Sequence, residues 1–173
     1  TKLPDFPYRP IIGAIIDSEG ASVFEQLIRS GRVDQLADQS QIDGLKASLT
    51  YSAVDYLKAM RVRTQIQAAF RNLFADLDLL VAPTHFSLPD RSDQPFDETE
   101  PKRPDLKGVG ADLVSASNLA GLPALSVPCG FVNGLPIGLQ FVGSPFSENV
   151  ILAAGREFQN RTDFHKQHPP AAI

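Results

Sequence analysis

The stretch from Asn118 to Gly143 (NLAGLPALSVPCGFVNGLPIGLQFVG) constrains the fold more than any other part of the chain. Two short apolar runs, Ala124–Val127 and Ile137–Val142, are separated by a segment rich in proline and glycine. Within it, Asn133-Gly134 is a strong turn dipeptide because both residues tolerate positive φ. The sequence therefore predicts two strands joined by a tight connection. Both runs are apolar at nearly every position, which is typical of strands buried on both faces in a sheet covered by helices.

Apolar residues at helical spacing surround this strand pair. The clearest periodic segment, 52–73, begins at Ser52, a favoured N-cap residue, and Asp55 stands at the capping-box position. The apolar run Leu77–Ala82 follows and predicts a buried strand ended by Pro83. A helix leading into a short apolar strand is an α/β pattern, so we predict a mixed β-sheet flanked by helices. Further helices are predicted over 11–29, within 33–49, and over 111–119 and 147–161.

Two proline-rich segments are expected to lack regular structure. Residues 1–10 contain three prolines and are predicted to be extended. Residues 85–110 combine prolines and acids with few aliphatic residues, which predicts a long loop or lid. No linker divides the chain, so residues 1–173 are predicted to form a single domain.

Several apolar residues are assigned to the core. Phe131, Phe141 and Phe146 could line an acyl pocket, but core packing is the favoured interpretation. Cys129 is interpreted as a small buried hydrophobe rather than a reactive thiol. The core candidates in the last helix are Val150, Leu152, Ala153 and Phe158.

Composition excludes several classes of function. The chain has a net charge of −4, so it lacks the basic footprint of a nucleic-acid-binding protein. No apolar run approaches the roughly 20 residues of a membrane span. A single cysteine supports neither an internal disulfide nor a metal cluster, and His85, His165 and His168 do not form a convincing metal site. We predict no cofactor, no metal and a cytoplasmic location.

The central stretch and its flanks resemble a known family. The segments YLKAMRVR (56–63), DLDLLVAPT (76–84) and PFSENVILAAGREFQ (145–159) are similar to the C-terminal part of amidase-signature enzymes. These are serine amidases, and the family includes an amidotransferase A subunit. The resemblance covers about 51–169. It implies an amidase-signature fold and hydrolysis of a small-molecule carboxylic amide to an acid and ammonia or an amine. In the central stretch it is carried by Asn118, Gly121, Pro123, Pro128, Gly130, Gly134, Pro136, Gly138 and Gln140.

The catalytic residues of the resembled family are not found in this chain. Its mechanism uses a lysine, a serine in a cis peptide and a nucleophilic serine, and both serines sit in a Gly/Ser-rich segment. The glycines here are dispersed, the pair Ser115 and Ser117 lacks flanking glycines, and no G-x-S-x-G elbow is present. We therefore predict no catalytic residue in this chain. The chain is expected to be a C-terminal fragment that is inactive alone, with the catalytic residues upstream.

Arg63 and Asn118 are the candidate substrate-binding residues. In glutamine-using members of the resembled family, an arginine near this helix and an aspartate before the Asn-Ala-Gly-Leu-Pro run grip the substrate. A guanidinium suits a carboxylate because its planar fork forms two bonds. Asp112 stands one residue from the expected position, which Ala111 occupies, and one residue turns a helical side chain by about 100°. A structural ion pair is the competing role for Arg63. For Asn118 the alternatives are a pocket wall and the satisfaction of backbone groups.

Three functions stay open at this point. The first is the C-terminal part of an amidase, whose partners would be an amide substrate and the N-terminal part of the same enzyme. The second is a glutamine-using amidotransferase A subunit, which would need a second protein as its partner. The third is a non-catalytic scaffold or binding domain. A sheet that ends in unpaired edges would also make the isolated chain self-associate.

Overall fold

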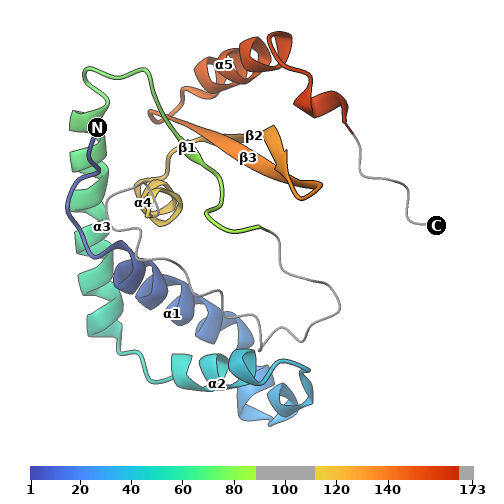
Figure 1. The fold of residues 1–173 in the computed structure, drawn as a ribbon. Coiled ribbons are helices and arrows are strands. Elements are labelled where there is room, and N and C mark those ends of the chain that lie inside the picture. The colour runs from blue at the N-terminus through green and yellow to red at the C-terminus, as the bar shows by residue number, and fades with distance from the viewer. Residues whose placement is uncertain (89–111, 168–173) are drawn as a thin grey trace.

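The computed structural model describes residues 1–88 and 112–167, and Figure 1 shows the arrangement of their elements. Helix α1 (Tyr8–Arg29) is followed by the 3-10 turn η1 (Arg32–Gln35), α2 (Gln39–Ser48) and α3 (Ala53–Leu73). Strand β1 (Leu79–Pro83) comes next, and the described chain resumes before α4 (Leu113–Ala120). Strands β2 (Ala124–Val132) and β3 (Leu135–Gly143) lead into α5 (Glu148–Asn160) and η3 (Phe164–Lys166). The α/β class with helices flanking a sheet is confirmed.

The N-terminal helices depart from the predicted boundaries. Helix α1 begins at Tyr8, so the prediction of an extended segment was wrong for 8–10. Pro10 is the third helical residue, where its missing N–H has no partner within the helix anyway. The helix predicted within 33–49 is divided into η1 and α2, and the Asp38 side chain caps α2 by accepting from the Gln41 N–H.

The N-cap of α3 is confirmed. The Ser52 hydroxyl oxygen accepts from the Asp55 N–H at 3.1 Å, and the Ser52 O–H donates to the Asp55 carboxylate at 2.6 Å. This hydrogen bond is the main reason why the pKa of Asp55 lies below its ordinary value. The first turn of α3 is therefore fixed by its own sequence.

The described sheet is antiparallel, with strand order β1-β3-β2. Asn133 and Gly134 both have positive φ (53° and 79°), which confirms the predicted hairpin turn. A register shift between Pro128 and Gly130 places a bulge at Cys129, whose side chain is half-buried rather than buried as predicted. The predicted strand 77–82 starts two residues later, at Leu79, and includes Pro83. In the sheet formed by the described residues β1 lies at the edge. The missing N–H of Pro83 therefore costs no hydrogen bond to a neighbouring strand there.

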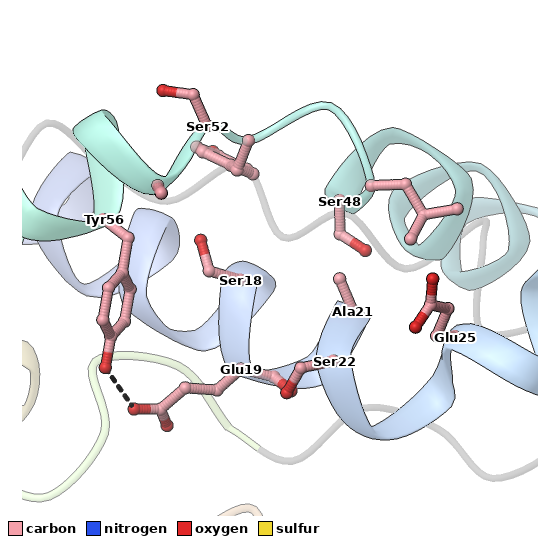
Figure 2. Close-up of a pocket in the computed structure, with 11 residues that line it drawn as sticks. Ser18, Glu19, Ala21, Ser22, Glu25, Ser48, Ser52 and Tyr56 are labelled. Atoms are coloured by element: carbon pink, nitrogen blue, oxygen red, sulfur yellow. Dashed lines mark hydrogen bonds between the residues drawn. The ribbon is translucent and has the colours of Figure 1, made fainter.

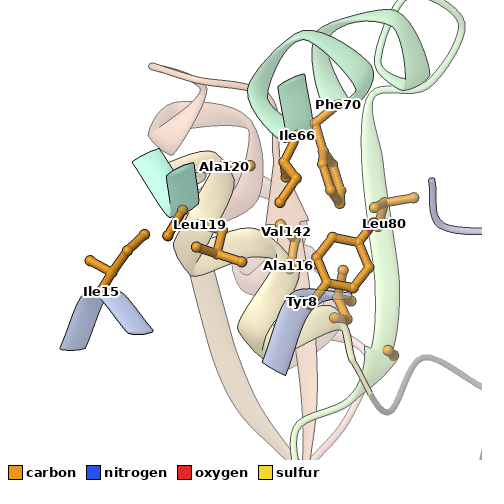
Figure 3. Packing of buried hydrophobic residues seen from close by; sticks show 12 residues of the cluster. Tyr8, Ile15, Ile66, Phe70, Leu80, Ala116, Leu119, Ala120 and Val142 are labelled. Atoms are coloured by element: carbon orange, nitrogen blue, oxygen red, sulfur yellow. The ribbon is translucent and has the colours of Figure 1, made fainter. Parts of the chain in front are cut away.

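One face of the sheet packs against helices α1, α3 and α4. Ile66, Phe70 and Val142 are each at most 1% exposed and lie at the centre of this cluster (Figure 3). Helix α4 contributes small side chains that allow close approach to α3 and the sheet. The buried members are Tyr8, Ile15, Ala59, Ile66, Phe70, Leu80, Ala82, Leu113, Ala116, Leu119, Ala120 and Val142.

The opposite face packs against α5. The buried centre consists of Val127, Phe141 and Ile151. The ring of Phe158 packs edge-on against the ring of Phe141, and the two ring centroids are 6.2 Å apart. The prediction that Val150, Leu152 and Ala153 belong to the core was wrong, since Val150 and Leu152 are 37% and 58% exposed and Ala153 is exposed as well. The buried stripe is shifted by one residue, onto Ile151 and Gly155. A Cβ on Gly155 would lie 2.4 Å from Leu125 Cδ2, so the glycine sets the approach of α5 to the sheet.

The hairpin is not buried on both faces along its length, which corrects a second expectation. Phe131, Val132, Leu135 and Ile137 are between 37% and 42% exposed. The covering helices contact the other half of the strands, and burial along β3 rises toward Gly143. The apolar tip therefore extends beyond the described layers. No helix of the described residues is long and apolar enough to cross a membrane.

Phe70→Ala tests the position of the core. Phe70 is 1% exposed, and its truncation is expected to lower the free energy of unfolding by about 3–5 kcal/mol in urea titrations. Phe24, also helical but 47% exposed, provides the matched control, and Phe24→Ala should cost about 1 kcal/mol or less. Equal losses in the two variants would contradict the described packing.

Candidate functional site

Arg63 connects α3 to the end of α4. Its Nε–H donates to the carbonyl oxygen of Leu119 at 3.0 Å, and the side chain is partly buried. The carbonyls of the last helical turn have no partner within the helix and carry the negative end of its dipole. A guanidinium therefore stabilises this end of α4 both by hydrogen bonding and by charge. This contact gives Arg63 a structural role, whether or not it also binds substrate.

Gly121 ends α4. It has φ 72°, its N–H donates to the Asn118 carbonyl, and the Leu122 N–H donates to the Ser117 carbonyl at 3.0 Å. This pattern is a Schellman motif, which needs a residue with positive φ. The Pro123 carbonyl then accepts from the Gly143 N–H at 3.1 Å, so the chain enters β2 beside β3.

Asn118 lies on the exposed side of this junction. Its backbone carbonyl takes part in the motif, whereas its side chain makes no hydrogen bond with another described residue. The interpretation that the side chain satisfies backbone groups is therefore not supported. The carboxamide remains accessible to a ligand, and its substrate-binding role stays a prediction.

Asp112 is bound at the other end of α4. Its carboxylate accepts from Arg9 Nε at 3.0 Å, which links the start of α4 to the start of α1. Asp112 and Leu119 are seven residues apart, so the contacts made by Asp112 and Arg63 lie about 10 Å apart along the helix. The structure does not bring Asp112 and Arg63 together as a clamp.

Tyr8, the first residue of α1, lies close enough to Asp112 for the two groups to interact electrostatically. The Tyr8 side chain is buried, and its O–H donates to the Pro4 carbonyl. Burial, and after it the negative charges of Asp112 and Asp5, raises the pKa of Tyr8 to about 12. Tyr8 therefore keeps its proton to a higher pH than a tyrosine exposed to solvent.

Ser115, Ser117 and Ser126 are the serines in α4 and β2, and the described residues give none of them an activating partner. Ser117 is 3% exposed, and its O–H donates to the Val114 carbonyl at 3.1 Å. The Ser126 hydroxyl is exposed and lies 2.6 Å from the Thr84 hydroxyl. Within the described residues no side chain hydrogen-bonds to Ser115, and none of the three serines hydrogen-bonds to a lysine, a histidine or a carboxylate. Nucleophilic catalysis by serine requires such a base.

The Ser126–Thr84 pair is better explained by sheet packing. The two hydroxyls bridge β2 and β1 across Gly138 of β3. A Cβ on Gly138 would lie 2.8 Å from the Thr84 oxygen and 3.0 Å from the Ser126 oxygen. Gln140, one step along the same face, donates to the Pro83 carbonyl at 3.1 Å and is 4% exposed. The polar residues of this sheet face therefore fix β1 against the hairpin.

The aromatic candidates separate into two groups. Core packing is confirmed for Phe141, which is 7% exposed. The prediction of core packing was wrong for Phe131 and Phe146, which are 37% and 93% exposed. Among the described residues, no three His, Cys, Asp or Glu side chains are grouped to hold a metal, and His168 lies outside those residues.

A groove of about 420 Å³ lies between α1, the end of α2 and the start of α3 (Figure 2). Glu19 and Glu25 lie on its α1 wall, and Tyr56 donates to Glu19 at 3.3 Å. The groove is at the far end of α1 from the Arg9–Asp112 pair, and neither Arg63 nor Asn118 lines it. This groove was not predicted from the sequence. Its signal was the spacing of Ser18, Ser22 and Glu25 on one helical face.

The arrangement of layers is that of amidase-signature enzymes. A crystal structure of an amidase is similar with a TM-score of 0.75 and 20% identity, covering 92% of this chain and 36% of the other. A bacterial aryl acylamidase of the amidase-signature family gives 0.74 and 20%, covering 95% and 36%. A structure described as a vestigial protein complex that reveals the origins of an s-triazine catabolic enzyme gives 0.74 and 27%, covering 92% and 35%.

Sequence comparison places the chain in a particular family. The Amidase family model matches residues 9–152, so the chain belongs to the amidase family. The A subunit of glutamyl-tRNA(Gln) amidotransferase from Desulforudis audaxviator is 44% identical over 124 residues, which are 71% of this chain and 24% of that protein. The protein of the same name from Geobacillus thermodenitrificans is 32% identical over 151 residues, 85% and 29% respectively. The chain thus spans about a quarter of the length of the curated relatives it matches.

Arg63→Gln tests the structural role of the α3–α4 contact. The substitution removes a charged donor from the Leu119 carbonyl, so the free energy of unfolding should fall by about 1–2 kcal/mol in urea titrations. Arg61, on the same helix and exposed, supplies the control, and Arg61→Gln should change the value by about 0.5 kcal/mol or less. Indistinguishable variants would rule out the contact as a stabilising one.

Tyr8 predicts a loss of stability at high pH. A tyrosine in the unfolded chain titrates near pH 10, about two units below the folded-state pKa of about 12. The folded chain therefore keeps this proton longer, and the contribution is fully present below about pH 10 and is lost as the pH rises through about 12. Urea midpoints measured across this range should fall less steeply in Tyr8→Phe. Tyr51→Phe, at an exposed tyrosine, is the control and should keep the wild-type slope.

Proposed function

We propose that this chain is the C-terminal part of an amidase that hydrolyses a carboxylic amide to an acid and ammonia or an amine. The observation that carries the proposal is the family match over residues 9–152, combined with relatives of about three times the length. The similar amidase and aryl acylamidase structures support it at the level of the fold. The substrate is a small-molecule amide, and neither nucleic acid nor a membrane is a partner of this part.

The proposed mechanism uses a Ser–Ser–Lys set supplied by the segment upstream of this chain. Hydrolysis of an amide needs a nucleophile, a base and donors for the oxyanion. Ser117 is buried against its own helix and Ser126 is paired with Thr84, so neither is ready to attack a carbonyl. The chain is therefore inactive alone, and the N-terminal part of the same enzyme is its partner. We keep the cytoplasmic location as part of this proposal.

This part of the enzyme contributes a wall of the substrate pocket. Helix α4 is fixed by Arg9 at one end and by Arg63 at the other, and it leaves the Asn118 carboxamide exposed. An exposed carboxamide on a rigid helix end offers both a donor and an acceptor to a polar substrate. Arg63 has further N–H groups besides the one bound to Leu119, so it is able to hold a carboxylate as well.

A glutamine-using amidotransferase A subunit is the second candidate. The identity of 44% to relatives of that name favours it. The missing clamp opposes it, because Asp112 pairs with Arg9 and is separated from the Arg63 contact by the length of α4. Such a function would also need a second protein as its partner. A non-catalytic scaffold is a third candidate, favoured because no base pairs with Ser115, Ser117 or Ser126 among the described residues.

Labelling by a fluorophosphonate probe, which reacts with activated serines, tests the proposal. The probe is applied to this chain and to the chain extended to the start of its gene. We expect labelling of the extended form only, at a serine outside residues 1–173. Labelling of this chain would contradict the upstream assignment, and Ser115→Ala, Ser117→Ala and Ser126→Ala would then identify the residue. Absence of labelling in both forms would favour the scaffold.

A further inference from the structure

Phe146 breaks the local rule of the turn in which it lies. The turn runs from Ser144 to Ser147 and connects β3 to α5 (Figure 1). The Ser147 N–H donates to the Ser144 carbonyl at 3.2 Å, so Pro145 and Phe146 are its two central residues. Phe146 has φ 64°. A turn with proline first and positive φ second ordinarily has glycine or asparagine at the second position, because a bulky side chain is strained there.

The surrounding contacts hold the turn in this conformation. The Ser147 hydroxyl donates to the Ser144 carbonyl at 2.7 Å, and the Ser147 carbonyl accepts from the N–H groups of Val150 and Ile151. A Cβ on Gly143 would lie 2.9 Å from Ile151 Cγ2, so the loop folds closely onto α5. The backbone of Phe146 is thus fixed by its neighbours rather than by its own side chain.

The Phe146 ring gains nothing from the described residues that would offset this strain. It is 93% exposed, more than any other large apolar side chain described. A strained residue that persists in a tightly determined loop is a sign of function rather than of folding. Exposed aromatic side chains on rigid supports commonly serve as anchors at interfaces.

We propose that Phe146 is an interface anchor that inserts into the upstream part of the same amidase polypeptide. This proposal rests on the proposed function, since it requires a longer chain. The length of the relatives, about three times that of this chain, provides the occupant. Val150, four residues further on at the start of α5, is a second apolar side chain that stays partly exposed, at 37%. The partner surface is therefore an apolar pocket of a folded polypeptide.

Photo-crosslinking in the protein produced from the complete gene tests the contact. Benzoylphenylalanine replaces Phe146, and in a second sample it replaces Leu152, which is 58% exposed on α5 and unstrained. We expect position 146 to crosslink within one molecule to a peptide upstream of residue 1, at least fivefold more than position 152. Crosslinks to a second copy, to residues 1–173, or to nothing would overturn the proposal.

Phe146→Asn gives an independent sign test in the same protein. Asparagine tolerates positive φ, so the substitution raises the thermal midpoint if the ring is free in solution. It lowers the midpoint by about 3 °C or more if the ring fills a pocket, which is the expected result. Leu152→Asn is the matched control and should change it little. An increase would overturn the anchor, whereas probe labelling of a serine reports separately on the amidase function.

Discussion

The pairing of β3 on both sides is the interaction on which the rest of the structure depends. Adjacent residues of a strand point to opposite faces, so Val142 enters the cluster with α3 and α4 while Phe141 enters the cluster with α5. The hairpin to β2 is local, but β1 lies almost sixty residues earlier, as the bond from Gln140 to Pro83 shows. Closing that distance has an entropic cost that only the completed core offsets. Gly138 leaves room for this pairing, because a Cβ there would lie 2.8 Å from the Thr84 hydroxyl and 3.0 Å from the Ser126 hydroxyl.

Helix α4 depends on its neighbours in the same way. A helix of eight residues is not stable by itself in water. Two arginines from other helices hold it, Arg9 at its first turn through Asp112 and Arg63 at its last turn through the Leu119 carbonyl. The negative charge of Asp112 lies at the positive N-terminal end of the helix dipole, and the positive charge of Arg63 lies at its negative C-terminal end. Arg63 and Asp112, the two residues compared with a substrate clamp, therefore hold helix α4 in place, and with it the proposed pocket wall.

Local chemistry made much of the fold predictable from the sequence. The Ser52 cap, the Asn133-Gly134 turn and the Gly121 helix end each follow from side-chain or backbone preferences of one to three residues. The predictions that were wrong concern positions where tertiary contacts, rather than local sequence, determine which side chains are buried or paired. Ile151 rather than Val150 and Leu152 is buried because Gly155 sets how α5 lies on Leu125. The ion pair of Arg9 with Asp112 joins residues 103 positions apart, and no local pattern predicts it. The candidate site was predictable as a helix-to-strand junction, while the groove beside Glu19 was not.

Exposed apolar side chains at two places, the tip of the β2–β3 hairpin and the Phe146 turn, support the view that a larger polypeptide packs against this part of the chain. The hairpin residues Phe131, Val132, Leu135 and Ile137 follow the pattern of strands buried on both faces, yet they remain more than one third exposed. Phe146 departs from the turn preference without any packing gain among the described residues. The hairpin residues are apolar side chains that no described element covers, whereas Phe146 has a strained backbone that no packing contact compensates. The two observations are therefore independent of each other. The hairpin tip and the Phe146 turn lie at opposite ends of β3, a strand of nine residues. A partner that covers both must therefore reach along the whole strand, about 30 Å.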